Sequence, residues 1–307
     1  MISFSNVGKS YRSWNGREVV ALTDFTLEVR EGEVFGLAGP NGAGKSTLIN
    51  LLLGFLGPTQ GDVRIAGLEP RRYVESNGVA YLSELINIPP SWSVVSALKR
   101  YALLAGIAPD ALRQRVEAAI TQLGLDEHRT KRVRQLSKGN LQRLGLAQAM
   151  LADARLVVLD EPTHGLDPVW TQRFRDIVNQ MRRPDRTILI ASHNLDELAR
   201  LADRVGIIDH GQLQRIVDVR ANEQTVTEGA PYRVVVVRGE ERILDRFPMA
   251  RGIGRGEFEL SGVSLETINL GIAALIESGV LISAVYPVHS ALEQQFREAV
   301  DAGKGEP

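Results

Sequence analysis

The feature that most constrains the fold of this chain is a glycine-rich run that ends in a lysine and two hydroxyl residues. Residues 39–47 read GPNGAGKST and fit the pattern G-x-x-x-x-G-K-[ST], which forms a phosphate-binding loop. The apolar residues 34–38 before it are typical of a buried strand, and residues 48–53 after it of a buried helix. A glycine-rich turn outside this setting binds nothing, whereas strand, loop and helix in this order predict a phosphate site.

The residue types of this loop have chemical reasons. Glycines let backbone N–H groups turn toward phosphate oxygens, and the N-terminus of the following helix adds partial positive charge. We predict that Lys45 reaches the β- and γ-phosphates and that the Ser46 hydroxyl holds Mg²⁺. The predicted nucleotide-binding residues of the loop are Gly39, Asn41, Gly42, Gly44, Lys45, Ser46 and Thr47.

Composition excludes several other classes of protein. The 307 residues allow one large or two smaller domains, and the net charge of −1 gives no global attraction to nucleic acid or membranes. The absence of cysteine excludes disulfides and thiol catalysis. No apolar run reaches the ~20 residues of a membrane helix, and the N-terminus shows no signal-peptide pattern. We therefore expect a cytoplasmic protein whose membrane role, if any, comes through a partner.

The pattern along the chain predicts several structural regions. Residues 1 to about 35 alternate apolar and polar positions around a hairpin turn at Asn15 and Gly16, which predicts an antiparallel sheet. Residues 85 to about 135 are helical in pattern, with one helix from Pro109 to Gly124. From residue 156 to 209 short apolar strands alternate with helical stretches, which predicts a mostly parallel α/β sheet.

The C-terminal part of the sequence has a different texture. Residues 221–230 are polar and turn-rich, so they are predicted to be a linker between a domain of residues 1–220 and one of residues 231–307. The second domain reads as a small α+β unit. Its predicted strands are residues 232–237, 257–260 and 280–285, and its predicted helices are residues 241–247, 265–278 and 290–299.

Two carboxylates at the end of an apolar strand are the second chemical signal. Asp160 and Glu161 follow residues 156–159, and the C-terminal ends of strands are where α/β sheets hold their ligands. Asp160 suits a Mg²⁺ site shared with Ser46, and Glu161 suits the orientation or deprotonation of an attacking water. Alone, the pair would be an ordinary solvated strand end; beside a phosphate loop we predict a catalytic pair.

A third signal lies at residues 136–143, which read LSKGNLQR. Ser137 and Gly139 stand at the start of a predicted helix, where a hydroxyl and backbone N–H groups form a second anion site. One nucleotide does not need two phosphate sites at helix starts. Two copies of the chain placed head to tail would use both.

These motifs together resemble the ATPase subunit of an ABC transporter, over about residues 1–220. The family signature LSGGQ appears as LSKGN, with Lys138 and Asn140 as departures, and residues 165–168 (GLDP) match the D-loop, which carries Asp167. The resemblance implies an α/β P-loop NTPase of the ABC-ATPase fold. Its parts would be a RecA-like core, an N-terminal antiparallel β subdomain, a helical subdomain at about residues 85–150, and the small α+β C-terminal domain.

The resemblance also implies roles for residues that are ambiguous by themselves. His193 matches the switch histidine at the γ-phosphate, although a lone histidine after a strand is usually structural. Tyr11 matches the aromatic that stacks on adenine, with Trp14 as a competitor, although such aromatics are usually core. Glu84 stands where the family usually has glutamine; it could bind Mg²⁺ while adding negative charge near the phosphates. Lys138 would bring positive charge near the partner's γ-phosphate.

The function implied by this resemblance is an ATP- and Mg²⁺-dependent motor. Two copies, or one copy and a paralogous ATPase, would sandwich two ATP molecules and pull on a separately encoded integral-membrane subunit docked near Glu84. Export is the expected direction, and the cytoplasmic face of the membrane the expected location. The closing domain resembles one found on many bacterial exporter-type ABC ATPases, where dimer contact, regulation and partner docking are all open roles.

Alternative functions lack supporting residues. A soluble ABC-type ATPase that moves no solute usually carries two cassettes or a long coiled coil, and a GTPase an N-K-x-D motif; neither pattern is present. The basic cluster Arg129, Lys131, Arg132 and Arg134 fits a solvated face, or contact with a membrane partner or anionic headgroups. Nucleic-acid binding is disfavoured because no aromatic residues are interleaved.

Overall fold

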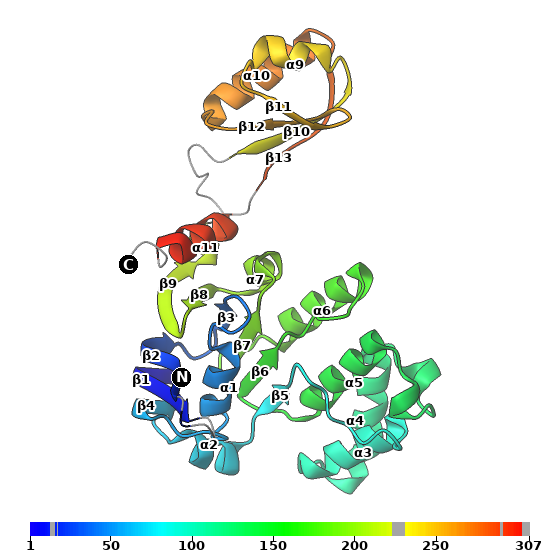
Figure 1. Cartoon of the computed structure of the whole chain (residues 1–307). Helices are drawn as coiled ribbons and strands as arrows, with labels where there is room; N and C mark the ends of the chain where they lie inside the picture. Colours follow the sequence, from blue (N-terminus) through cyan, green and yellow to red (C-terminus); the bar gives the residue numbers. More distant parts are fainter. Residues whose placement is uncertain (13–15, 17, 223–230, 289–290, 303–307) are drawn as a thin grey trace. The chain divides into compact units, whose positions relative to one another are not determined.

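The computed structural model describes the chain apart from residues 13–15, 17, 223–230, 289–290 and 303–307 (Figure 1). The described residues divide into two compact units, Met1–Val217 and Asp218–Ala302. The predicted linker, residues 221–230, falls mostly outside the described residues, as do Trp14 and Asn15.

A largely parallel sheet forms the centre of the first unit. Its order is β5 (Ala80–Leu82), β6 (Leu156–Asp160), β7 (Thr187–Ser192), β3 (Val34–Ala38), β8 (Arg204–Asp209) and β9 (Gln212–Asp218). The pairs from β5 through β8 are parallel, and every residue of β3, β6 and β7 is buried. Burial on both faces explains why these strands read as continuous apolar runs in the sequence. The predicted parallel α/β sheet is confirmed.

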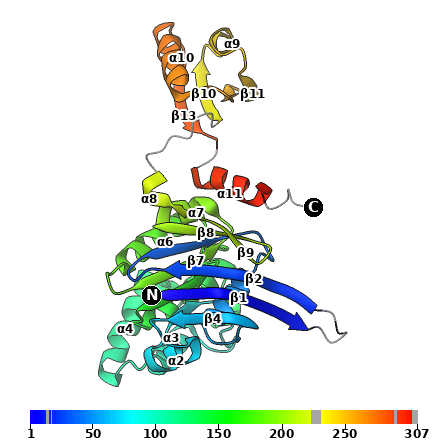
Figure 2. The ribbon, with the colours of Figure 1, turned by 90° about the vertical axis from the view of Figure 1, so that its left-hand side faces the viewer.

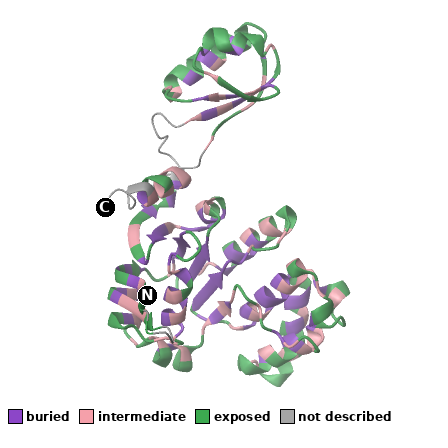
Figure 3. Ribbon diagram, in the orientation of Figure 1, coloured by how far each residue is buried: buried purple, intermediate pink, exposed green. Residues whose placement is uncertain are grey.

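The strand register decides which loops meet. Ala38 at the end of β3 pairs with Ser192 at the end of β7, and Asp160 at the end of β6 pairs with Ala191. Parallel strands end at one edge of the sheet, so the glycine-rich loop, Asp160 and Ser192 are brought to the same edge. Helices α1 (Lys45–Leu52), α6 (Pro168–Met181) and α7 (Leu195–Leu201) lie beside this core. Figure 3 shows the buried residues concentrated in the sheet.

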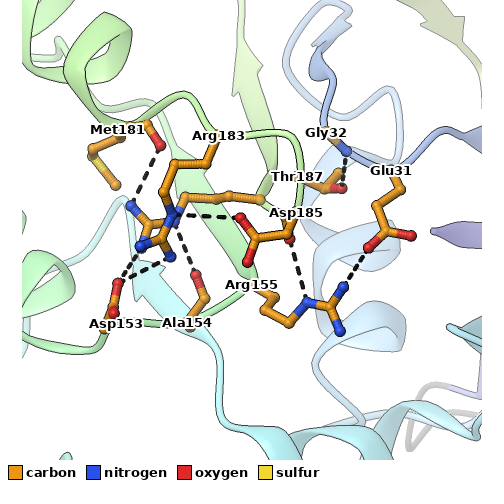
Figure 4. A network of polar contacts seen from close by, with 10 residues as sticks. Glu31, Gly32, Asp153, Ala154, Arg155, Met181, Arg183, Asp185 and Thr187 are labelled. Atoms are coloured by element: carbon orange, nitrogen blue, oxygen red, sulfur yellow. Dashed lines mark hydrogen bonds and ion pairs between the residues drawn. The ribbon is translucent and has the colours of Figure 1, made fainter.

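The opposite edge of this sheet is tied together by charged side chains (Figure 4). Arg186, just before β7, donates to the carbonyls of Ala154 (3.1 Å) and Met181 (3.3 Å) and contacts Asp153. Arg155, just before β6, contacts Glu31 and the carbonyl of Asp185. These contacts fasten the starts of the strands and leave the carboxyl ends available for a site.

An antiparallel sheet of β2 (Glu18–Val29), β1 (Ile2–Arg12) and β4 (Gln60–Ile65) lies beside the core (Figure 2). The pairing of β1 with β2 runs from Ile2–Val29 to Arg12–Glu18, so the predicted N-terminal antiparallel sheet is confirmed. Phe4 and Phe25 meet edge to face with ring centroids 5.7 Å apart. They join one apolar cluster with α1 and the parallel strands, which makes the two sheets a single body. The short α2 (Pro70–Asn77) packs on β4.

The helical region consists of α3 (Val94–Leu104), α4 (Pro109–Gln122), η1 (Asp126–His128), η2 (Val133–Gln135) and α5 (Lys138–Leu151). The prediction of helix from residue 85 is wrong for its first part, because residues 83–93 contain no helix. Pro89 and Pro90 disfavour helix there, and α3 begins only after Ser93, whose hydroxyl accepts from the Ser96 N–H at 3.2 Å. The predicted helix from Pro109 to Gly124 is confirmed as α4.

The second unit is built on an antiparallel sheet in the order β11 (Arg251–Gly254), β12 (Glu257–Leu260), β10 (Tyr232–Arg238) and β13 (Leu281–Pro287). Its own apolar cluster, with Val234, Ile243 and Ile268 fully buried, joins the sheet to α9 (Glu241–Arg246) and α10 (Leu265–Glu277). The unit also contains α8 (Val219–Asn222) and α11 (Ala291–Ala302). The strands and helices predicted after residue 231 are present with ends that differ by at most three residues, and β11 was not predicted.

Candidate functional site

The loop between β3 and α1 requires glycine at defined positions. Gly44, the residue before α1, has φ +112°, and Gly42 has φ +84°; both are values that favour glycine. A Cβ on Gly39 would lie 2.4 Å from the carbonyl oxygen of Ile208, so the close approach of β8 excludes any side chain there. The glycine spacing therefore has a steric cause in this fold.

Lys45, the first residue of α1, is folded back into the loop. Its Nζ donates to the carbonyls of Gly39 (2.6 Å) and Pro40 (3.2 Å) and lies 4.0 Å from Oε1 of Glu161. Burial lowers the pKa of Lys45, while Glu161, Asp160 and Glu84 act to raise it. The lysine is a buried cation whose hydrogen bonds are made to backbone carbonyls, so an anion entering the loop would meet a charge already in place.

A cavity of about 310 Å³ opens beside this lysine. It brings together residues from the loop, from the end of β6 and from the segment after β5. The residues that line it are Ala21, Pro40, Asn41, Gly42, Gly44, Lys45, Ser46, Thr47, Glu84, Asp160 and Glu161. Among these described residues the ionisable groups are one lysine and three carboxylates. The cavity is therefore rich in negative charge and in oxygen atoms that can bind a metal ion.

Asp160 shows the effect of that charge directly. It is 6% exposed at the end of β6. Its pKa is raised to about 6, chiefly by burial and then by the nearby Glu84 and Glu161, while Lys45 acts to lower it. A carboxylate in this position is costly when ionised, and a cation bound beside it would remove the cost.

The donor set fits Mg²⁺ when nucleotide phosphate is present. Hydroxyl and carboxylate oxygens, here Ser46, Asp160 and Glu84, are the ligands that Mg²⁺ prefers. Within the described residues, no group of three or more His, Asp or Glu side chains is arranged to hold a metal ion by itself. This agrees with the general habit of Mg²⁺, which is held by one or two carboxylates together with substrate phosphates.

Glu161 is held by the last residue of β7 and the residue that follows it. Its Oε1 accepts from the backbone N–H of His193 at 3.1 Å, and its Oε2 lies 3.3 Å from the Ser192 hydroxyl and 2.9 Å from Nδ1 of His193. The backbone of Glu161 has φ +46°, the left-handed region that costs a non-glycine residue about 1–2 kcal/mol. The two predicted catalytic residues, Glu161 and His193, are therefore in contact, with the glutamate aimed at Lys45.

Tyr11 lies at the rim of the site. Its hydroxyl is 3.3 Å from Oγ1 of Thr47, the residue is 37% exposed, and Nζ of Lys9 lies 5.5 Å from the ring centroid. It is not among the residues that line the cavity. Tyr11 therefore lies next to the phosphate loop and is partly exposed, with Lys9 over its ring.

The predicted second anion site does not line the cavity of its own chain. Ser137 begins α5, where its Oγ accepts from the Asn140 N–H at 3.3 Å. Asp167 begins α6, where its Oδ1 accepts from the Trp170 N–H at 2.9 Å. Gly139 approaches the segment before Asp167 closely, since a Cβ on it would lie 3.0 Å from the carbonyl oxygen of Gly165. The start of α5 and the segment before Asp167 therefore lie close together, and neither Ser137, Gly139 nor Asp167 lines the cavity beside Lys45.

Gln142 contacts the backbone of the site and was not predicted from the sequence. Its side chain is buried, and its Nε2 donates to the carbonyls of Glu161 (3.2 Å) and Pro162 (2.9 Å). It therefore links α5 to the backbone that carries the predicted catalytic glutamate. The available signal was its position: a polar residue among the apolar side chains of a helix buried along much of its length.

A parallel α/β sheet with a glycine loop, a buried lysine and two strand-end carboxylates defines a P-loop nucleotide-binding protein. The family model described as "ABC transporter" matches residues 22–164, which include the loop, Asp160 and Glu161. The lantibiotic transport ATP-binding protein SrtF of Streptococcus pyogenes is 32% identical over 69% of this chain and 89% of its own length. The chain therefore belongs to the ABC transporter ATP-binding proteins; it is the ATP-binding subunit of an ABC transporter and an ATPase.

Other comparisons agree with this assignment. The uncharacterized ABC transporter ATP-binding protein YhcH of Bacillus subtilis (strain 168) is 28% identical over 100% of this chain and 98% of its own length. The fold is shared with the ATP-binding cassette MJ0796, solved as a dimer bound to ADP and Pi, at a TM-score of 0.66 and 21% identity over 72% of this chain and 99% of that chain. Among the described residues, every helix is too short or too polar to span a membrane.

Proposed function

We propose that two copies of this chain bind two Mg²⁺-loaded ATP molecules head to tail and hydrolyse them to drive a separately encoded integral-membrane subunit. The observation that carries the proposal is the convergence of Lys45 and Glu161 on one cavity, 4.0 Å apart, with Asp160 and Glu84 beside them. Lys45 would hold the β- and γ-phosphates and Glu161 would position the attacking water.

The remaining predicted roles follow from the same geometry. Ser46, Asp160 and Glu84 would supply oxygen ligands to Mg²⁺, which neutralises phosphate charge during transfer. His193 would contact the γ-phosphate from its place against Glu161, and Tyr11 would stack on adenine. Gly39, Asn41, Gly42, Gly44 and Thr47 would surround the phosphates or shape the loop that does.

The dimer is proposed because the two anion sites of one chain are distinct. Ser137 and Gly139 do not line the cavity beside Lys45, yet they place a hydroxyl and backbone N–H groups at the start of α5. In a head-to-tail pair these groups, with Asp167, would complete the site of the other copy. A paralogous ATPase in place of the second copy would serve equally.

The membrane partner is proposed to dock on the helical region near Glu84. Leu85 is 81% exposed and Leu104 at the end of α3 is 80% exposed, which suits an apolar contact. Export is the proposed direction, because relatives include a lantibiotic transport protein and a Nod factor export ATP-binding protein. The chain would then lie on the cytoplasmic face of the membrane. The compact unit beginning at Asp218 supports the proposed C-terminal domain of residues 231–307, after a cassette of residues 1–220.

The proposal is tested with Glu161→Gln in the purified chain. The amide keeps the shape of the side chain but cannot serve as a general base, so we expect hydrolysis to fall at least 100-fold. ATP binding should persist, and ATP should convert the variant to a dimer in size-exclusion chromatography. Lys45→Ala is the control and should lose ATP binding. Full turnover by Glu161→Gln would refute the assignment.

A further inference from the structure

Lys138, which stands where the family signature has glycine, does not project freely from the start of α5. Its Nζ lies 2.8 Å from Nε2 of His164 in the same chain. Its methylene groups cover Gly165, since a Cβ on Gly165 would lie 3.0 Å from both Cγ and Cδ of Lys138. The side chain thus spans from the signature to the segment between Glu161 and Asp167.

The chemistry of this contact defines its donor and acceptor. A lysine ammonium has three donors and no acceptor, so Nε2 of His164 accepts and its ring carries the proton on Nδ1. A hydrogen bond from a charged donor is about twice as strong as a neutral one. The pair is a directional link between α5 and the loop that contains His164.

Two other contacts fasten α5 to the same loop. Gln142, just over one helical turn after Lys138, donates to the carbonyls of Glu161 and Pro162. Gly139 packs against the carbonyl of Gly165. The loop is therefore attached to α5 near Glu161 by Gln142 and near Asp167 by Lys138. The attachment at the Asp167 end depends on a side chain that a glycine signature does not have.

We infer that Lys138 is a positioning residue that locks the signature of each copy to the loop of residues 161–167 in that copy. The inference rests on the proposed head-to-tail dimer. Ser137 and Gly139 would serve the ATP of the partner, whereas Glu161 serves the ATP of its own chain. The contact of Lys138 with His164 fixes the distance between the signature residues and Glu161 before the partner binds. The surface that meets the partner's nucleotide is therefore preformed. One of the three donors of Lys138 is then used by His164, and the side chain serves positioning and not phosphate binding.

The test measures ATP-driven dimerisation in the Glu161→Gln background by analytical ultracentrifugation. Lys138→Met keeps the methylene cover over Gly165 but removes the donor, and His164→Ala removes the acceptor. We expect each to weaken dimerisation about tenfold, and the double variant to be no weaker than either single variant. His164→Gln, which keeps an acceptor, should retain most of the dimerisation. Binding of fluorescent ATP to the monomer is measured in parallel and should not change.

Three outcomes overturn the inference. If Lys138→Met weakens dimerisation and His164→Ala does not, Lys138 acts on the nucleotide directly. If the two losses add in the double variant, or if neither variant changes dimerisation, the residues do not act as a pair. Failure of the proposed function gives a different result, because Glu161→Gln alone would then bind no ATP or form no dimer.

Discussion

At the scale of single residues, the ionised form of Asp160 is energetically unfavourable in the folded chain. Its pKa in the folded chain is raised to about 6, above the ordinary value of 3.8, so between these pH values the folded state binds more protons than the unfolded state. Stability contributed by this group therefore falls as the pH rises from about 4 to 6 and stays low above that. The cost of the ionised carboxylate is on the order of 3 kcal/mol.

Asp160→Asn is expected to stabilise the chain in the absence of nucleotide and Mg²⁺. A neutral amide removes the buried charge, so Tm at pH 7.5 should rise by about 5 °C or more, with the difference shrinking toward zero near pH 4. Differential scanning fluorimetry from pH 4 to 8 measures this. Asp196→Asn, at an exposed position on α7, is the matched loss of one carboxylate and should change Tm little. An Asp160→Asn variant with unchanged or lower Tm at pH 7.5 contradicts the argument.

The residues of the site differed in how far the sequence revealed them. Lys45 and the glycines follow a spacing that one loop geometry imposes, so their placement was predictable. The contacts of Gln142 with Glu161 and of Lys138 with His164 were not, because they join segments about 20 residues or more apart whose approach depends on the packing of α5. The pKa of Asp160 likewise depends on burial and on neighbours that a linear sequence does not supply.

At the scale of elements, the chain just after α4 packs closely against α6 at Gly124. This glycine has φ +56°, and a Cβ on it would lie 2.7 Å from Cη2 of Trp170. Arg143 of α5 stacks on the Trp170 ring with its guanidinium carbon 4.0 Å from the centroid, and it donates to the Gly124 carbonyl at 3.3 Å. Three helices therefore meet at one point where no side chain fits on residue 124.

Gly124→Ala should destabilise the chain more than Gly106→Ala. Gly106 also has a positive φ, +78°, but a Cβ there has nothing within 4 Å. Both substitutions cost about 1 kcal/mol for the backbone, and the clash with Trp170 should add roughly 1–3 kcal/mol at residue 124. Urea unfolding of the two variants measures the difference. Equal losses of unfolding free energy in the two variants would contradict the prediction, because α6 would then have moved away from the new methyl group at no cost.

Elements with a strong local pattern were predictable, and those that depend on distant partners were not. The helix from Pro109 was confirmed because its apolar spacing and its start and stop signals lie within the segment itself. The strand β11, Arg251–Gly254, has every residue exposed and pairs with β12, so its sequence carries no core-facing alternation. The order of the parallel strands also could not be read, because each crossover connection is compatible with several neighbours.

At the scale of the whole molecule, the two compact units have separate apolar cores. A chain of this kind is not expected to unfold in one cooperative step. Only the first unit carries the cavity with Lys45, so a ligand bound there stabilises that unit by mass action.

Differential scanning calorimetry should therefore show two transitions for this chain. ATP with Mg²⁺ at 100 times its dissociation constant should add about 2.7 kcal/mol to the first unit and raise its transition by several degrees. The other transition should not move. A variant that cannot hold phosphate, Lys45→Ala, should show two transitions with no shift. One transition that moves as a whole with ATP would contradict the independence of the two units.

The left-handed backbone of Glu161 has an evolutionary consequence. The backbone there is one that glycine adopts without strain, whereas glutamate does so at a cost in every copy of the protein, whether or not ATP is present. With the proposed catalytic role of Glu161, selection for turnover would keep that cost in place. A duplicated copy that no longer needed to hydrolyse ATP would lose this selection, while the backbone energy would still favour glycine at residue 161. We therefore expect the non-hydrolysing half of a heterodimer to have lost the glutamate at this position.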